Sequence, residues 1–78
     1  MIDNESLAAL IRTDIPDAEV DIVDRTGGMD HFNVTVRSQA FKGKTLIQQH
    51  QLVYGALQRA LRDGRVHAVE LKTVVAEG

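Results

Sequence analysis

The chain has 78 residues and a formal net charge of −2, and 44% of its residues are hydrophobic, which fits one folded domain spanning residues 1–78 and not a disordered protein. It contains no cysteine, which excludes a disulfide, a thiol nucleophile and a thiolate metal ligand from this chain. It also lacks the long apolar run of a membrane span, and its acidic first residues are unlike a secretion signal, so we expect a soluble cytoplasmic protein.

A short amphipathic helix is predicted over residues 4–13, where apolar residues recur at helical spacing. Asp3 or Asn4 is suited to cap its first turn, and Pro16 prevents it from continuing. Its buried edge is expected to consist of Leu7, Leu10 and Ile11.

Two β-strands are predicted next, over residues 18–23 and 32–37, where apolar and polar residues alternate. The loop of residues 25–31 between them contains Gly27 and Gly28, so the two strands are expected to form an antiparallel hairpin. The side chains expected on the water-facing side of the sheet are Glu19, Asp21, Asn33, Thr35 and Arg37.

A long amphipathic helix is predicted within residues 41–61, with Thr45 as its N-cap and with its opening residues able to form a separate turn. Its apolar stripe is expected to contain Leu46, His50, Val53, Ala56, Leu57, Ala60 and Leu61. Its water side is expected to contain Gln48, Gln49, Gln51, Gln58 and Arg59. Since His50 lies on the apolar stripe, we expect it to have a structural role as a partly buried imidazole.

The last strand is predicted over residues 66–74, which gives the order α-β-β-α-β, or α-β-β-α-α-β if the long helix is split. We therefore predict an α/β (more narrowly α+β) fold, with a three-stranded mixed sheet and the helices packed on one face. The helical crossover between the second and third strands leaves those two strands parallel.

Side chains suited to covalent catalysis are scarce. Ser6 and Ser38 have no acid–base partner at a recognisable spacing, and there is no glycine-rich phosphate fingerprint or zinc-type ligand pair. The sequence therefore predicts that the protein is not an enzyme.

Three histidines remain as candidate metal ligands: His31 in the hairpin loop, His50 on the long helix and His67 at the start of the last strand. The start of a strand can leave an imidazole at the rim of a sheet, within reach of a partner. His67 is therefore the strongest of the three candidates.

Several segments of the chain together resemble the BolA family. They are Phe41-Lys-Gly-Lys-Thr-Leu46, His50-Gln-Leu-Val53, Val66-His67-Ala68-Val69-Glu-Leu-Lys72-Thr73 and His31-Phe32-x-Val34-x-Val36. The family pattern is F-x-G-x-x-L, a histidine four residues later, and then I/V-H-A with a nearby K-T. The resemblance extends over nearly the whole chain and implies an α-β-β-α-α-β fold similar to class II KH domains.

The resemblance also implies that the protein is an adaptor for a monothiol glutaredoxin, with which it would share a bridging [2Fe–2S] cluster in iron–sulfur trafficking or in iron and redox regulation. The cluster histidine of the family corresponds to His67. A second ligand usually comes from the loop between the first two strands, where the cysteine of some relatives would fall near Gly28. His31 is the imidazole that this loop offers instead. Because imidazole nitrogens are the iron ligands that this chain offers, we expect no cluster in the isolated protein. We expect the free protein to be a monomer or a weak homodimer.

The alternative is a transcriptional regulator that binds DNA or RNA through a KH-like surface. Residues 31–78 carry seven basic and three acidic residues, a net charge of +4 against −6 for residues 1–30. The candidate contacts are Lys42, Gly43 and Lys44 in the turn, followed by Arg59, Arg62 and Arg65. A third possibility is a protein-interaction module that binds neither a cluster nor nucleic acid.

Overall fold

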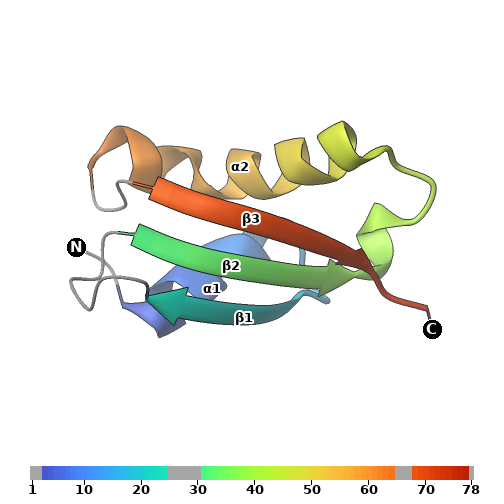
Figure 1. Ribbon diagram of the computed structural model, residues 1–78, viewed down its shortest axis with the longest axis horizontal. Helices are drawn as coiled ribbons and strands as arrows, with labels where there is room; N and C mark the ends of the chain where they lie inside the picture. The colour runs from blue at the N-terminus through green and yellow to red at the C-terminus, as the bar shows by residue number, and fades with distance from the viewer. Residues whose placement is uncertain (1–2, 25–30, 65–67, 78) are drawn as a thin grey trace.

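The computed structural model describes residues 3–24, 31–64 and 68–77, without the side chains of Asp24, His31 and Ala68. Its elements are α1 (Asn4–Asp14), β1 (Glu19–Asp24), β2 (His31–Ser38), the 3₁₀ helix η1 (Gln39–Phe41), α2 (Leu46–Arg62) and β3 (Ala68–Val75) (Figure 1). The central strand β2 pairs antiparallel with β1 and parallel with β3. The predicted three-stranded mixed sheet is therefore confirmed.

The element boundaries differ from the predicted ones by one or two residues. β1 begins at Glu19 instead of residue 18, β2 covers two more residues than predicted, and β3 continues to Val75. The predicted first residues of the last strand, Val66 and His67, lie outside the described residues. The additional helical element between the hairpin and the long helix is the short η1.

Local hydrogen bonds explain where the two α-helices begin. Asp3 caps α1, because its carboxylate accepts a 2.7 Å hydrogen bond from the backbone N–H of Ser6. Thr45 and Gln48 form a capping box at the start of α2, in which each side chain accepts a hydrogen bond from the other residue's backbone N–H. Gly43, with φ of 75°, turns the chain into this cap in a conformation that few other residues adopt.

The hydrophobic core lies between the helices and one side of the sheet. Phe32, Val34 and Val36 point alternately inward from β2 and are almost completely buried. They pack in one cluster with Leu7, Ile11, Ile15, Ala18, Phe41, Val53, Leu57 and Ala60. Burial of each large side chain contributes about 1.5–3 kcal/mol to folding.

The other side of the sheet is in contact with water, as the alternation predicts. Glu19, Asp21, Asn33 and Arg37 are exposed there, and Thr35 is half-buried. The helices therefore pack on one face only.

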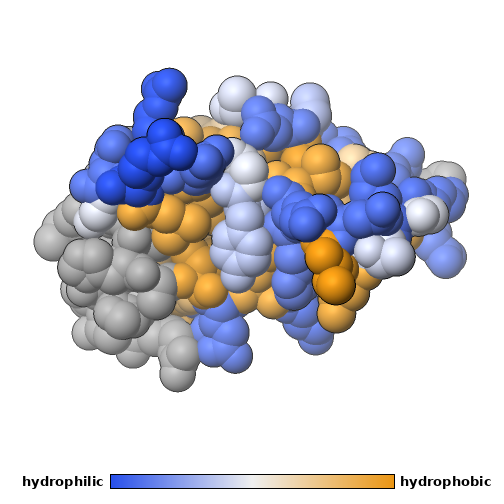
Figure 2. All heavy atoms as spheres, turned by 90° about the horizontal axis from the view of Figure 1, so that it is seen from above, coloured by the Kyte–Doolittle hydropathy of each residue, from blue (hydrophilic) through white to orange (hydrophobic). Residues whose placement is uncertain are grey.

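The first turn of α2 is rotated relative to the prediction. Gln49, which was expected on the water side, is buried, whereas Leu46, expected in the apolar stripe, is 62% exposed. The neighbouring Ile47 is 71% exposed. Seen from the α2 side, apolar atoms consequently reach the surface between the polar side chains (Figure 2).

Candidate functional site

β2 and β3 begin at the same edge of the sheet, because they are parallel. His31 is the first residue of β2, and its Cα is paired in register with Ala68, the first residue of β3. The residue that precedes Ala68 in the chain is His67, which lies outside the described residues. The register therefore places His31, one predicted ligand, beside Ala68, and Ala68 is the residue that follows the other predicted ligand, His67, in the sequence.

The next pair along these strands anchors this edge to the core. Phe32 is in register with Val69, and it is 1% exposed. Leu57 and Ala60 of α2 belong to the same buried cluster. The backbone at the start of β2 is therefore held by packing from one side and by strand pairing from both neighbours.

His50 lies elsewhere in the fold, near the first turns of α2. It is half-buried, and its ring makes an edge-to-face contact with Tyr54, with 6.4 Å between the ring centroids. The adjacent Gln49 bonds to Thr73, which is five residues along β3 from Ala68, or about 16 Å at the rise of a strand. The structure therefore does not bring His50 to the edge where β2 and β3 begin.

The basic residues predicted to contact nucleic acid fall into two groups at opposite ends of α2. Lys42 and Lys44 flank Gly43 in the exposed turn before the helix, whereas Arg59 and Arg62 lie in its last turns. A helix rises about 1.5 Å per residue, so the two groups are about 22 Å apart along its axis. Arg65 lies outside the described residues.

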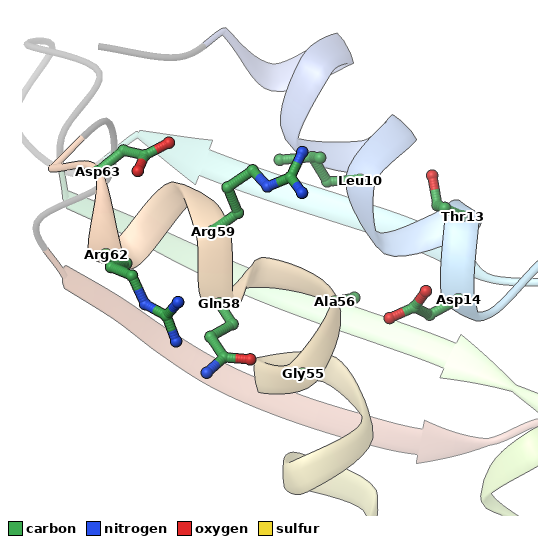
Figure 3. Close-up of a pocket in the computed structure, with 9 residues that line it drawn as sticks. All are labelled: Leu10, Thr13, Asp14, Gly55, Ala56, Gln58, Arg59, Arg62 and Asp63. Atoms are coloured by element: carbon green, nitrogen blue, oxygen red, sulfur yellow. The ribbon is translucent and has the colours of Figure 1, made fainter.

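Arg59 and Arg62 border a depression between the ends of α1 and α2, together with Leu10, Thr13, Asp14, Gly55, Ala56, Gln58 and Asp63. Their guanidinium groups point in different directions, Arg59 towards Leu10 of α1 and Arg62 along the Gln58 side of α2 (Figure 3). The two arginines therefore do not form a single clamp for a phosphate in this structure.

Two polar pairs that the sequence did not indicate fix the segment around the Lys42–Lys44 turn. The hydroxyl of Ser38 donates a 2.5 Å hydrogen bond to Asp17, and the backbone N–H of Gln39 donates a 2.9 Å bond to the same carboxylate. These two donors, the Ser38 hydroxyl foremost, lower the pKa of Asp17 below its usual 3.8. The second pair, Gln49 and Thr73, links α2 to β3. Both pairs join residues more than 20 positions apart in the sequence, so no local sequence pattern could have predicted them.

The described ranges 3–24, 31–64 and 68–77 contain neither a preformed metal site nor a membrane span. Within these ranges, no three His, Cys, Asp or Glu side chains lie close enough together to hold a metal ion. Within the same ranges, neither helix has the length and apolar character needed to cross a bilayer.

The family model of BolA-like proteins matches residues 4–77. The chain belongs to the BolA-like family. It is 32% identical over 73 residues to an uncharacterized protein of Rickettsia prowazekii, RP812, and the match covers 94% of each chain. It is also 29% identical over 73 residues to Protein BOLA2 of Arabidopsis thaliana, covering 92% of this chain and 76% of that protein.

Solved BolA structures have the same fold as this chain. BolA1 from Arabidopsis thaliana superimposes with a TM-score of 0.80 at 28% identity, covering 95% of this chain and 94% of that one. The BolA domain of SufE1 from the same plant superimposes with a TM-score of 0.79 at 25% identity, covering 96% and 95%. The BolA-like segments found in the sequence are thus part of a complete BolA fold.

Proposed function

We propose that this BolA-like protein is a non-enzymatic adaptor that pairs with a monothiol glutaredoxin and shares a bridging [2Fe–2S] cluster with it. The observation that carries the proposal is the register of His31 with Ala68, the residue after His67, at the common starting edge of β2 and β3. One candidate imidazole ligand, His31, thus begins β2, and the other, His67, immediately precedes the first residue of β3 in the sequence.

The donor chemistry of the chain supports a shared cluster and not one that this protein holds alone. A [2Fe–2S] cluster takes four ligands, usually thiolates, and histidine can replace two of them. This chain has three histidines and no cysteine, so it can supply imidazole nitrogen but no sulfur. The remaining ligands would come from the thiolate of the glutaredoxin and from glutathione. His67 is the principal ligand in this proposal, and His31 is the second.

The family relationship supports a role in iron–sulfur metabolism, because a BolA domain is also part of the Arabidopsis protein SufE1. We propose a role in cluster trafficking or in iron and redox regulation, in the cytoplasm. The test is anaerobic reconstitution of the chain with iron, sulfide and glutathione, with and without a monothiol glutaredoxin. We expect a visible circular dichroism spectrum for the mixture that differs from that of the glutaredoxin alone. Identical spectra with and without this chain would contradict the proposal.

A second candidate function, binding of DNA or RNA, is favoured by the turn between η1 and α2. KH domains hold a nucleic-acid strand with a glycine-containing loop between two helices. Here Gly43 has φ of 75°, and exposed Lys42 and Lys44 flank it between two helical elements. Measurement of binding to single-stranded and double-stranded oligonucleotides across salt concentrations tests this function.

A further inference from the structure

The exposed large apolar residues of the described part of the chain are not scattered. Five of the six belong to α2 and β3, and the sixth is Val23 of β1. We call the four of these residues that lie on the helix side of the sheet the α2–β3 face: Leu46, Ile47, Tyr54 and Val75; Val74, in register with the water-facing Arg37, points to the other side. Isolated exposed apolar residues are common, but a grouped set on two adjacent elements is typical of an interaction surface.

A ring contact along α2 and a hydrogen bond between α2 and β3 fix the residues beside the α2–β3 face. Leu46, His50 and Tyr54 follow one another at four-residue spacing along α2, and the rings of His50 and Tyr54 touch. The bond from Thr73 to Gln49 holds the end of β3, with Val75, against the first turn of α2. This surface begins at the opposite end of β3 from Ala68, so it is separate from the proposed cluster edge.

β3 is an edge strand, because the order of strands in the described sheet is β1-β2-β3. An edge strand presents backbone N–H and C=O groups that another extended chain can pair with. The two edges of this sheet differ in protection: the six residues of β1 include three acids, Glu19, Asp21 and Asp24, whereas the eight residues of β3 include one acid and one lysine. The β3 edge is therefore the one suited to accept another strand.

The charges around the α2–β3 face indicate the chemistry of the occupant. Exposed Lys44, with Lys42 two residues before it, lies near the end of β3, because Gln49 bonds both to the backbone carbonyl of Lys44 and to Thr73. Towards the other end of α2, Arg62 lines a hollow together with Tyr54. An apolar segment flanked by acidic residues would complement these charges.

The position of α2 favours a single strand over a second copy of the chain. α2 runs alongside the β3 edge of the sheet (Figure 1). Antiparallel pairing of two β3 edges would place the α2 helices of both copies on one side of the joined sheet, whereas an extended segment adds no helix there. A single extended segment needs only the width of one strand.

We propose that the β3 edge, together with the apolar flank of α2, is a docking site for an extended, apolar segment of a partner protein that is flanked by acidic residues. The segment adds a fourth strand to the sheet beside β3. Its alternate side chains contact Leu46, His50 and Tyr54. This goes beyond the cluster-sharing function, because it requires neither a metal nor a glutaredoxin.

The test uses the full chain labelled with ¹⁵N and the synthetic peptide EEVTVTVTEE. We expect amide shift changes along residues 69–75 and 46–54 and none along 19–24. Two matched peptides carry methyl groups on backbone nitrogens, the first peptide at its valines and the second at its threonines. Alternate backbone N–H groups point to the same edge of a strand, so each peptide lacks the hydrogen-bond donors of one edge. We expect one of them to lose binding and the other to keep it, and equal binding of both would contradict strand addition.

The matched protein variants are Leu46→Lys with Ile47→Lys on the α2–β3 face and Val23→Lys on the opposite edge of the sheet. All three side chains are more than half exposed, so the fold should tolerate the changes. We expect the double variant to weaken peptide binding about tenfold and Val23→Lys to leave it unchanged. Shift changes centred on β1, no binding of the peptide, or a dimer of the free chain that the double variant dissociates would each overturn the proposal.

Discussion

The hydroxyl of Thr73 donates a 2.6 Å hydrogen bond to the side-chain oxygen of Gln49. The amide nitrogen of Gln49 in turn donates a 3.0 Å bond to the backbone carbonyl of Lys44. A single buried side chain therefore joins β3, the first turn of α2 and the turn that precedes it. In the same turn of α2, Leu46 is left 62% exposed.

We predict that Gln49→Ala destabilises the protein by about 1–3 kcal/mol, because the Thr73 hydroxyl loses its acceptor in a partly buried position. The control is Gln51→Ala, which removes an exposed side chain two residues away and should cost less than about 0.5 kcal/mol. Urea unfolding gives both values. Equal effects of the two substitutions would show that the Gln49 bonds contribute nothing to stability.

The rotation of α2 illustrates what the sequence could not predict. Leu46, His50, Val53 and Leu57 have good helical spacing, and a buried stripe that begins with Gln49 in place of Leu46 is less favourable by hydrophobicity alone. The deciding partner, Thr73, lies 24 residues further along the chain, so its effect is invisible to a local pattern. The later turns, where Val53, Leu57 and Ala60 are buried, were predicted correctly.

The hydrogen bonds from Ser38 and Gln39 to Asp17 should make stability depend on pH. They lower the pKa of Asp17 in the folded protein, so their contribution is complete above the unfolded value of 3.8 and is lost as pH falls through the lower folded value. We predict that Asp17→Asn is less stable than the parent at neutral pH and that the difference shrinks below about pH 4. Thermal unfolding across pH measures this.

Ser38→Ala is the matched variant for that experiment, because it removes the principal donor and leaves the carboxylate in place. It should reproduce the sign and the pH range of the Asp17→Asn effect. A loss of stability that is the same at all pH values for both variants would contradict the assigned hydrogen bonds.

The candidate cluster edge was predictable in part. The sequence predicts His67 at the start of the last strand, and the crossover rule makes that strand parallel to its neighbour. The register of His31 with Ala68 was not predictable, because it depends on the pairing of Phe32 with Val69 on the core side of the sheet. A shift of one residue would have placed a different pair at the edge.

We predict that the purified protein alone forms no stable [2Fe–2S] cluster, since it has no cysteine to supply a thiolate. The measurement is visible absorption after anaerobic incubation with iron and sulfide, without glutathione or partner. A stable, stoichiometric cluster spectrum under these conditions would contradict the prediction.

If the protein binds nucleic acid through the turn before α2, Lys42→Ala with Lys44→Ala should weaken binding. The slope of log affinity against log salt concentration should then fall by about two at most, because each lysine can neutralise one phosphate. The matched control is Arg59→Ala with Arg62→Ala, which removes the same charge at the other end of the helix. A nucleic-acid affinity that changes neither with salt concentration nor with either pair of substitutions would rule out binding through the turn before α2.

The central claim is that His67 ligates a cluster shared with a glutaredoxin, and visible circular dichroism of the reconstituted complex across pH tests it most directly. A neutral imidazole binds iron, and it does so less well below about pH 6.5, where the free ring takes up a proton. We predict that His67→Ala remains folded but changes the spectrum of the complex or its pH stability, that His31→Ala has a smaller effect, and that His50→Leu changes mainly protein stability. A folded His67→Ala variant whose complex has the spectrum and pH stability of the parent would contradict the claim.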